Sequence, residues 1–312
     1  MQLALYFSAI PAFLLCVVLG ANNLSTCLGT SIGARGLRYS QALALASVGL
    51  MAGILLEGNK LSRAITLGVV PSGDPQIALV VALAGLAVMI FLTYRRLPIS
   101  LSQVAVGAAV GAAVVAGAEV NWTFTLLIAL SWLMTPLVGF AIANLISQVT
   151  RRVGKQVRGV FTQNIMYSYL TILSGVYASY ALGANTVGLI IGLVDFPASE
   201  RFLLSVAMGL ATILGMLLFS RGTTLSVAEN LVGLNPSASF ASQMGGAATV
   251  HGFTQFGIPV SISQAVVGGI FGAATQRKFV VRNDRLTREI VLGWTVAPLL
   301  GAGLAAVIKA IF

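Results

Sequence analysis

Long apolar segments alternate with short polar connectors along almost the whole chain. In the first half this pattern predicts helices at residues 3–20, 39–56, 76–94, 97–116 and 123–146. The second half repeats the order at residues 160–182, 202–219, 240–256, 259–274 and 290–312. A helix needs about 20 apolar residues to cross the roughly 30 Å of hydrocarbon in a bilayer. We therefore predict an all-α integral membrane protein in which residues 240–256 and 259–274 are too short to cross comfortably.

These two short segments are separated only by Gly257 and Ile258, and no charged residue lies nearby. A loop that connects two full crossings is normally polar, so the spacing favours a re-entrant hairpin with its tip buried at mid-membrane. The corresponding residues 76–116 are expected to form a second hairpin, with Arg95 and Arg96 near its tip. Full crossings give the same topology and stay open as the alternative, which would place both arginines in the cytoplasm.

A set of polar and small residues recurs at a nearly constant distance along the chain. The stretch from Pro98 to Gln103 returns as Pro259 to Gln264 at an offset of 161, and Asn22 returns as Asn185 at an offset of 163. Unrelated residue types that share one offset indicate a duplicated unit. We predict a first repeat at residues 1–155 and a second repeat at residues 156–312, each containing a broken helix, a span, a hairpin and a further span.

The composition agrees with this interpretation and narrows the class of protein. Hydrophobic residues make up 57% and charged residues 8% of the 312 residues, and the mean hydropathy is +0.95, whereas soluble domains average about 25% charged residues. The first apolar segment lacks a basic start and a small-residue cleavage site, so we expect it to be a span and not a removable signal. The expected location is the cell membrane, with several crossings.

The formal net charge of +10 does not indicate nucleic-acid binding, because the basic residues lie in connectors between spans. Cytoplasmic connectors are usually enriched in Lys and Arg. If the chain starts outside and the second repeat is inverted, all of these basic clusters fall on the cytoplasmic side, which supports an inverted repeat. The clusters are Arg35 and Arg38; Arg151, Arg152, Lys155 and Arg158; and Arg277, Lys278, Arg282, Arg285 and Arg288.

Polar residues within the apolar segments are the candidates for function. The stretches that open with Pro98 and Pro259 are typical of helix N-termini, which are ready sites for anions. The polar run from Gly20 to Thr26 is costly in lipid, so it either lines a cavity or packs against another helix. A membrane enzyme is disfavoured because the single His, the two cysteines Cys16 and Cys27, and the few acidic residues do not converge, and we expect no metal. A passive anion channel stays open.

The repeated motifs resemble those of the inorganic phosphate transporter (PiT) family over nearly the whole chain. The resemblance is carried by Gly20-Ala21-Asn22-Asn23, by the paired Pro-x-Ser motifs, and by the Trp132/Pro136 and Trp294/Pro298 pairs. It implies a secondary transporter with inverted repeats, broken helices and two re-entrant hairpins around a tetrahedral oxyanion. The chain departs from the family at Asn23 and Thr186, where the family has Asp, and at Gln103 and Gln264, where it has His.

The resemblance also implies which residues surround the anion. The helix N-termini would point their partial positive ends at it, and the two Gln residues would either donate to it or fix the hairpin tips. Sulfate only accepts hydrogen bonds, whereas phosphate also donates one and is best matched by a carboxylate. Because the carboxylates are lost, sulfate is favoured and phosphate is the alternative, as in the sulfate permease branch of the family. The predicted shell is Asn22, Asn23, Thr26, Ser100, Ser102, Gln103, Asn185, Thr186, Ser261, Ser263 and Gln264.

Import of an anion against a negative-inside potential costs about 2.3 kcal/mol per charge per 100 mV, so a coupled cation is expected. The candidates are H⁺, carried by Glu57 or His251, and Na⁺, held by neutral oxygens. Glu57 at the end of a span is also explained by an interfacial position, and His251 by a hydrogen-bonded structural role. No other cofactor is expected. A homodimer is a possible assembly, and alternating access by rocking of the two repeats is the expected mechanism.

Overall fold

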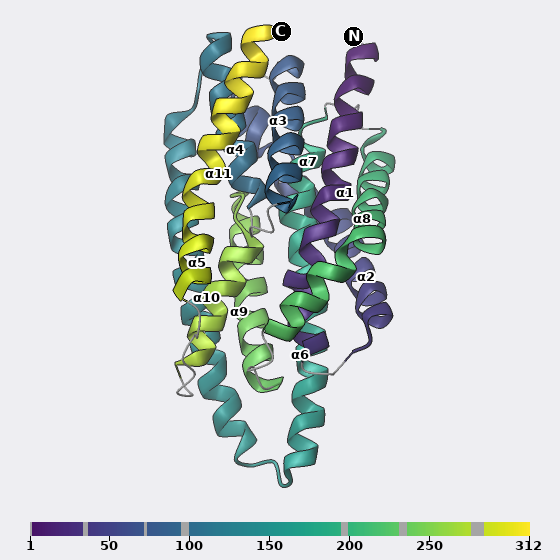
Figure 1. Cartoon of the computed structure of the whole chain (residues 1–312), viewed down its shortest axis with the longest axis vertical. Coiled ribbons are helices and arrows are strands. Elements are labelled where there is room, and N and C mark those ends of the chain that lie inside the picture. The colour runs from purple at the N-terminus through teal and green to yellow at the C-terminus, as the bar shows by residue number, and fades with distance from the viewer. Residues whose placement is uncertain are drawn as a thin grey trace.

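The computed structural model describes residues 2–33, 37–71, 74–94, 100–194, 199–230, 236–275 and 284–312. Within these ranges the regular structure is entirely helical (Figure 1). Six stretches are long and apolar enough to cross a membrane, at Ala9–Gly29, Tyr39–Val69, Pro75–Tyr94, Trp122–Gly154, Arg201–Gly222 and Leu292–Ile311. The prediction of an all-α membrane protein with several spans is confirmed.

The first half contains five long helices and two short ones. These are α1 (Gln2–Gly33), α2 (Tyr39–Glu57), the 3₁₀-helix η1 (Gly58–Lys60), the π-helix η2 (Ala64–Val69), α3 (Pro75–Tyr94), α4 (Leu101–Ala116) and α5 (Trp122–Gly154). The second half follows with α6 (Val160–Leu182), the π-helix η3 (Gly183–Val187), α7 (Gly188–Ile191), α8 (Arg201–Asn230), α9 (Pro236–Gln255), α10 (Ile262–Ala274) and α11 (Asp284–Ile311). The expected polar connector after Glu57 is therefore largely helical.

The two predicted helix breaks differ in the structure. The expected interruption at residues 20–26 is absent, because α1 is a continuous α-helix there. Two of its polar side chains bond to their own backbone: Asn23 Nδ2 donates to the carbonyl of Leu19 at 3.0 Å, and Ser25 Oγ donates to that of Asn22 at 2.8 Å. In the second half the helix does change, since residues Gly183–Val187 form the π-helix η3, a distortion that is frequent at functional sites.

Pro259 does not open its hairpin helix. Pro259 and Val260 lie before α10, which begins at Ile262 with Ser261 as its N-cap. In the first half α4 begins at Leu101 with Ser100 as its N-cap, and Pro98 lies outside the described residues. Serine is a strong N-cap because its hydroxyl can accept from a free backbone N–H in the first helical turn. The helix N-termini predicted from the prolines therefore begin a few residues later, at the serines.

The helix pairs α3/α4 and α9/α10 occupy different ends of the molecule. Figure 1 shows α3 and α4 in the upper half and α9 and α10 in the lower half, while α5 runs along most of the length. Helices from the two halves pack in matching combinations: α1 packs on α8 as α6 packs on α2, and α4 packs on α11 as α10 packs on α5. The α3/α4 pair therefore lies against α11, the last helix of the second half, and the α9/α10 pair lies against α5, the last helix of the first half.

Glycines at equivalent positions allow these close contacts. A β-carbon on Gly107 of α4 would lie 2.1 Å from the carbonyl oxygen of Pro298, and one on Gly268 of α10 would lie 2.0 Å from that of Pro136. The two glycines are 161 residues apart and the two prolines 162. Small residues let helix backbones approach closely in membrane proteins. The two halves thus meet through the same positions of their repeated sequences.

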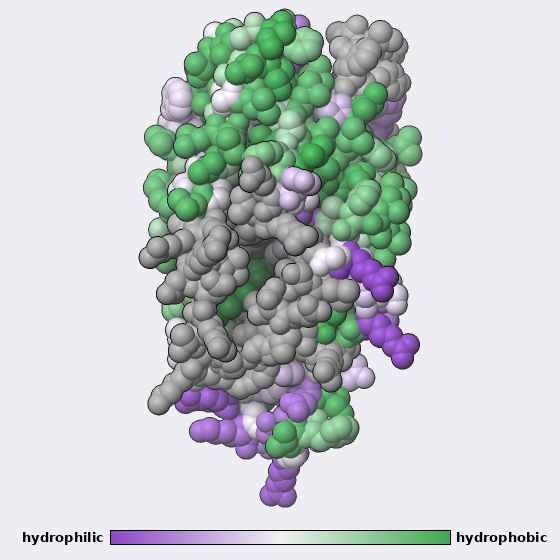
Figure 2. All heavy atoms as spheres, viewed as in Figure 1, coloured by the Kyte–Doolittle hydropathy of each residue, from purple (hydrophilic) through white to green (hydrophobic). Residues whose placement is uncertain are grey.

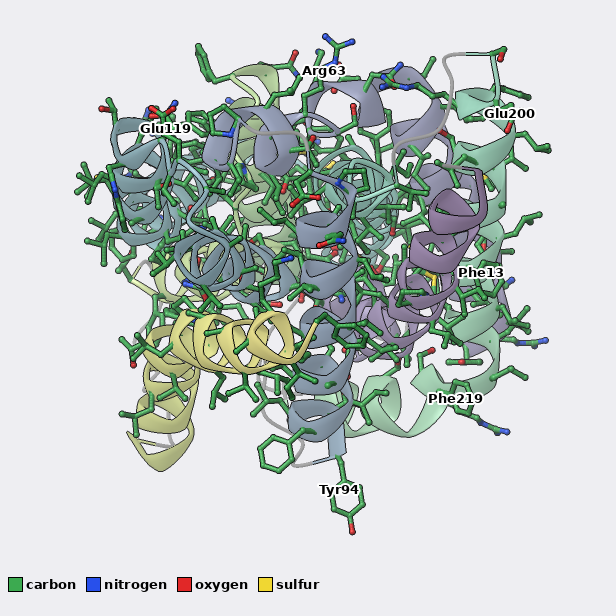
Figure 3. The ribbon with its side chains drawn as sticks, turned by 90° about the horizontal axis from the view of Figure 1, so that it is seen from above. Phe13, Arg63, Tyr94, Glu119, Glu200 and Phe219 are labelled. Carbon is green, nitrogen blue, oxygen red and sulfur yellow. The ribbon has the colours of Figure 1, made fainter. Side chains whose placement is uncertain are left out.

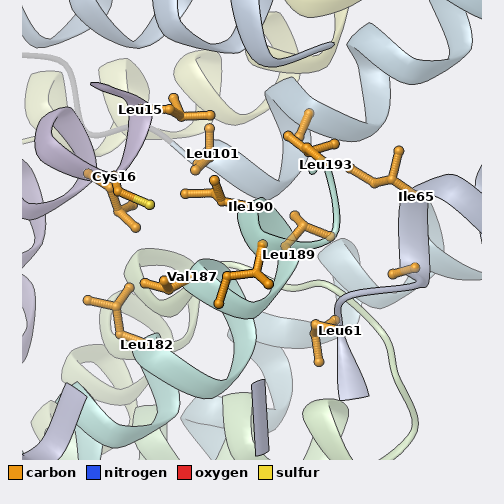
Figure 4. Packing of buried hydrophobic residues seen from close by; sticks show 14 of the residues in the cluster. Leu15, Cys16, Leu61, Ile65, Leu101, Leu182, Val187, Leu189, Ile190 and Leu193 are labelled. Carbon is orange, nitrogen blue, oxygen red and sulfur yellow. The ribbon is translucent and has the colours of Figure 1, made fainter. Parts of the chain in front are cut away.

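Large apolar side chains fill the centre and also cover the outside. Figure 4 shows Leu15 of α1, Leu101 of α4 and Ile190 of α7 pointing toward one another, and all three are buried. On the face drawn in Figure 2, apolar residues cover most of the upper part and hydrophilic residues gather at the lower end. That end carries the α5–α6 connector with the exposed Lys155 and Arg158. An apolar flank with a charged end is typical of a protein embedded in a bilayer.

Candidate functional site

The serine-containing turns of the two halves meet at one small pocket. Two segments that lie far apart in the sequence contribute their N-caps, Ser100 of α4 and Ser261 of α10, while α1 and η3 close the sides. The described residues that line the pocket are Leu19, Asn23, Ser100, Leu101, Ser102, Thr186, Val260, Ser261, Ile262 and Ser263. The structure thus brings together Asn23, Ser100, Ser102, Thr186, Ser261 and Ser263 from the predicted shell.

The beginnings of α4 and α10 supply the polar character of this pocket. Ser100 Oγ lies 3.0 Å from Ser102 Oγ, and Ser261 Oγ accepts a weak hydrogen bond from the backbone N–H of Gln264 at 3.4 Å. The first-turn N–H groups of a helix have no partner within the helix, and the helix dipole places a partial positive charge there. Two such ends at one pocket favour a negatively charged ligand.

Among the described residues that line the pocket, none carries a charge. Asn23, Ser100, Thr186 and Ser261 are each at most 6% exposed. A ligand here would therefore be held by hydroxyls, a carboxamide and backbone N–H groups instead of ion pairs. Each hydrogen bond to a charged group contributes about 1.5–3 kcal/mol, so several of them can replace the lost solvation of an anion.

The pocket is tight in this conformation. Its volume is about 10 Å³, which is near the minimum that one water molecule needs. A tetrahedral oxyanion is larger than water, so its binding requires the two turns to move apart. In this conformation the pocket is too small for such an anion, and we call this arrangement closed.

Asn185, predicted as a ligand residue, fixes the α9–α10 turn. Its Nδ2 donates to Thr254 Oγ1 at 2.9 Å and to the carbonyl of Ile258 at 3.2 Å, and its Oδ1 accepts from the N–H of Val260 at 3.2 Å. Trp132 Nε1 on α5 donates to the carbonyl of Pro259, the residue beside this turn, at 3.0 Å. Asn185 therefore holds the turn that precedes Ser261 and does not line the pocket, and it stays a prediction as a ligand residue.

Asn22 has the corresponding arrangement in the first half. Its Nδ2 donates to Thr93 Oγ1 at 2.5 Å, and Thr93 is separated from Thr254 by the repeat offset of 161. Thr26 is half-buried on the same helix and does not line the pocket. The two threonines were missed by the sequence analysis, although their recurrence at the repeat offset was available as a signal. Asn22 and Thr26 as ligand residues stay predictions.

Gln103 and Gln264 lie just behind the pocket serines, in the first turns of α4 and α10. They are 3% and 2% exposed, and within the described part of the chain the Oε1 atom of each has no hydrogen-bond partner. A buried acceptor without a partner costs about 1–3 kcal/mol. Neither glutamine lines the pocket, and both stay predictions as ligand residues.

The two residues predicted for proton coupling lie in contact with each other. His251 Nε2 of α9 is 2.9 Å from Glu57 Oε2 at the end of α2. Neither residue lines the pocket, but His251 is on the helix that leads into the α9–α10 turn. Arg95 and Arg96, predicted near the other turn, lie outside the described residues, and Arg221 is exposed on α8.

Comparison with known proteins places this geometry in a family. The sequence profile of the phosphate transporter family matches residues 19–164 and 154–306, which include every residue of the pocket. The chain belongs to the phosphate transporter family. The resemblance seen in the motifs is thereby confirmed, and the protein is a multi-pass membrane protein of the cell membrane.

Individual relatives align with nearly the whole length of this chain. It is 28% identical over 306 residues to a protein of Methanocaldococcus jannaschii named "Putative phosphate permease", with 96% of this chain and 95% of the relative aligned. It is 24% identical over 304 residues to the sulfate permease CysP of Bacillus subtilis, with 94% and 84% aligned. A solved structure titled "The sodium-dependent phosphate transporter" has the same fold, with a TM-score of 0.88, 21% identity, and coverage of 100% of this chain and 99% of that one.

Proposed function

We propose that this protein is a secondary transporter that moves inorganic phosphate across the cell membrane by alternating access, together with a cation. The main support for this proposal is that Ser100 and Ser261, the N-caps of α4 and α10, lie at one uncharged pocket that is rich in hydrogen-bond donors. This geometry selects a small anion with several oxygens, because donors approach it from two helix ends at once. Transport of such an ion requires no covalent chemistry.

The pocket suits an oxyanion held between the repeats. The hydroxyls of Ser100 and Ser102 approach from α4, those of Ser261 and Ser263 from the α10 end, and Thr186 and Asn23 close the remaining sides. Burial strengthens each of these hydrogen bonds, because the local dielectric is low. Separation of the turns on one side at a time would expose the ligand to each face of the membrane in turn.

The inverted repeat supplies a mechanism for this movement. Residues 1–155 and 156–312 are proposed as the two repeats, and the matching helix contacts and glycine positions support that division. The hairpins are proposed to be re-entrant, which agrees with the position of α3 and α4 at one end and of α9 and α10 at the other (Figure 1). Rocking of one repeat against the other around the pocket would then alternate its access.

Phosphate is proposed ahead of sulfate, which reverses the order expected from the motifs. The family description and the relative from Methanocaldococcus jannaschii both refer to phosphate. The P–OH group of phosphate needs an acceptor, and the partnerless Oε1 atoms of Gln103 and Gln264 provide neutral ones close to the pocket. The lost carboxylates therefore do not exclude phosphate.

Sulfate is the second candidate, and one observation favours it. Asn23 and Thr186 leave the described lining of the pocket without any carboxylate, so an anion that only accepts hydrogen bonds meets no repulsion. An aligned relative from Bacillus subtilis is named as a sulfate permease, which supports this second candidate. Both anions are tetrahedral, and the same donors would hold either of them.

Uptake of labelled phosphate into proteoliposomes tests the proposal. We expect accumulation above equilibrium when a proton or sodium gradient is imposed, and competition by unlabelled phosphate at lower concentrations than by sulfate. The reverse order of competition would assign sulfate as the substrate. Downhill flux of either anion that no cation gradient can drive uphill would identify a channel and reject the carrier mechanism.

A further inference from the structure

A polar cluster joins the end of α2 to α9, the first arm of the second hairpin. We name the side chains of Glu57, Lys60, His251 and Gln255 the α2–α9 cluster. Glu57 Oε1 accepts from Lys60 Nζ at 3.0 Å, and Glu57 Oε2 accepts from Gln255 Nε2 at 3.0 Å and lies 2.9 Å from His251 Nε2. Lys60 Nζ also donates to Gln255 Oε1. The single histidine of the chain is thus part of a charged network.

Two tyrosines of α6 complete the surroundings of His251. The hydroxyl of Tyr177 is 2.5 Å from Nδ1, and the rings of Tyr177 and Tyr180 lie edge-on to the imidazole at 5.5 and 5.6 Å. Among the described residues, the titratable or charged groups around His251 are Glu57 from α2, the two tyrosines from α6, and Lys60 from η1, which pairs with Glu57. Both ring nitrogens have oxygen neighbours, which is the arrangement that a proton-binding imidazole requires.

The position of the cluster is unusual for so many polar groups. Glu57 and Lys60 lie inside the apolar stretch Tyr39–Val69, which is long enough to cross a membrane. Ionisable residues within such segments are costly and mark ion or proton pathways by default. The side chains of Glu57 and His251 retain 18% and 28% of their exposure, so the cluster lies at the edge of the packed core and not within it.

We propose that the contact between Glu57 and His251 is the proton-binding site that couples anion transport to the proton gradient. In the neutral ring, Tyr177 O–H donates to Nδ1 and Nε2–H faces Glu57. An incoming proton binds Nδ1, and the tyrosine hydroxyl rotates to accept from it. The local charge then rises from zero, given by Glu57 and Lys60, to +1, and this charge offsets part of the charge of the anion.

The fold connects this site to the pocket through α9. His251 and Gln255 flank Thr254, whose hydroxyl accepts from Asn185, and Asn185 also holds the turn that precedes Ser261. The backbone of the turn itself reaches η1, since a β-carbon on Gly257 would lie 3.3 Å from the carbonyl oxygen of Lys60. Protonation strengthens the attraction between His251 and Glu57. It therefore favours the closed hairpin, and loss of the proton weakens the contact that keeps it closed.

This inference rests on the proposed transport function, and one experiment separates the two. Proteoliposomes that contain the full chain are loaded with the pH dye pyranine, and both labelled phosphate uptake and lumenal pH are recorded. With an acidic outside, we expect wild-type protein to accumulate phosphate and to acidify the lumen. Accumulation that follows a sodium gradient and ignores the pH gradient would overturn the proton site but leave the transport function standing. Absence of any phosphate or sulfate flux would overturn the transport function itself.

Two variants test the residues, with Arg221→Gln as the matched control of an exposed polar side chain. The His251→Gln variant is expected to accumulate at least about tenfold less phosphate under a pH gradient. Its phosphate exchange in counterflow, which needs no net proton movement, should continue. Glu57→Gln removes the neighbouring negative charge, so half-maximal uptake should move to a more acidic pH, and Glu57→Asp should restore part of that shift. If His251→Gln also stops exchange, Glu57→Gln decides the question, and an unchanged pH profile in that variant would refute the site.

Discussion

The two halves contribute equivalent residues to the pocket, but they differ in the polar residues near it. Each half supplies a serine N-cap to the pocket. Each half also has an Asn that donates to a Thr on the first arm of its hairpin, Asn22 to Thr93 and Asn185 to Thr254. The α2–α9 cluster has no such counterpart. At the repeat offsets of 161 and 162, Glu57 corresponds to Phe219 and His251 to Ile90.

The counterparts of the cluster face outward. Phe219 is 61% exposed, Ile90 is 52% exposed and Tyr94, the counterpart of Gln255, is 85% exposed. Figure 3 shows Tyr94 projecting away from the bundle, with Phe219 at another part of its edge. Such apolar side chains suit a lipid-facing surface. An anion between the halves can be contacted by both, whereas a coupling proton needs only one site, and the residues proposed for binding are repeated while those proposed for coupling are not.

The largest effect is expected where the halves pack most closely. Gly107→Ala and Gly268→Ala would each place a β-carbon about 2 Å from a backbone carbonyl oxygen, and overpacking of this kind typically costs about 1–3 kcal/mol or more. We expect a large loss of folded protein, of similar size for both variants. The measurement is the yield and thermal unfolding of the purified protein in detergent.

The control for these variants is Gly303→Ala on α11. Nothing lies within 4 Å of a β-carbon at that position, and Ala is favoured over Gly in a helix by up to about 1 kcal/mol. This variant should retain or slightly raise the unfolding temperature. If only one of the two packing glycines proved sensitive, the equivalence of the two interfaces would be refuted.

The next effect concerns the pocket serines. Ser100→Ala and Ser261→Ala each remove one hydroxyl that faces the proposed anion, and a hydrogen bond to a charged group is worth about 1.5–3 kcal/mol, or about 10- to 100-fold in affinity. We expect each single variant to raise the KM for phosphate by about tenfold at least, and the double variant to abolish measurable uptake. The initial rate of labelled phosphate uptake checks this. Normal uptake by the double variant would place the binding site elsewhere.

The sequence predicted this pocket because its polar residues are repeated. Ser100 and Ser261 had to meet if the two copies faced each other, so repetition carried the spatial information. The apolar lining residues Leu19 and Val260 gave no comparable signal, since they resemble the many other apolar residues of the chain. Repeated polar residues therefore indicated which segments meet at the pocket, and the apolar part of its wall came only from the structure; anion binding there stays a prediction.

Other features depended on contacts that the sequence does not encode locally. An Asn in an apolar helix can bond its own backbone, as Asn23 does, or another segment, as Asn22 and Asn185 do, and the sequence does not show whether the helix then breaks. For this reason the break predicted at residues 20–26 was wrong. The approach of Glu57 to His251 was likewise not predicted, although both were candidates, because neither residue has a repeated partner to reveal the contact.

A smaller effect is expected when a carboxylate is introduced into one side of the pocket. Thr186→Asp adds a negative charge next to the anion, and it also adds an acceptor that only a protonated anion can use. We expect competition by sulfate to weaken about tenfold relative to competition by phosphate. The ratio of the two inhibition constants in the uptake assay is the measurement. Asn23→Asp, on the α1 side of the same pocket, should change the ratio in the same direction.

The smallest effect should distinguish Asn22 from Asn185, the two residues that bond to the hairpins. Asn185 makes three hydrogen bonds to its hairpin, whereas Asn22 donates to Thr93, and a typical hydrogen bond contributes about 0.5–1.5 kcal/mol. Asn185→Ala should therefore lower the unfolding temperature more than Asn22→Ala and raise the KM for phosphate by a few-fold. Thr254→Val, which keeps the shape but removes one of the three partners, should have an intermediate effect. Equal losses from both Asn variants would mean that the two turns are held with equal strength, so that the asymmetry between the halves would be confined to the α2–α9 cluster.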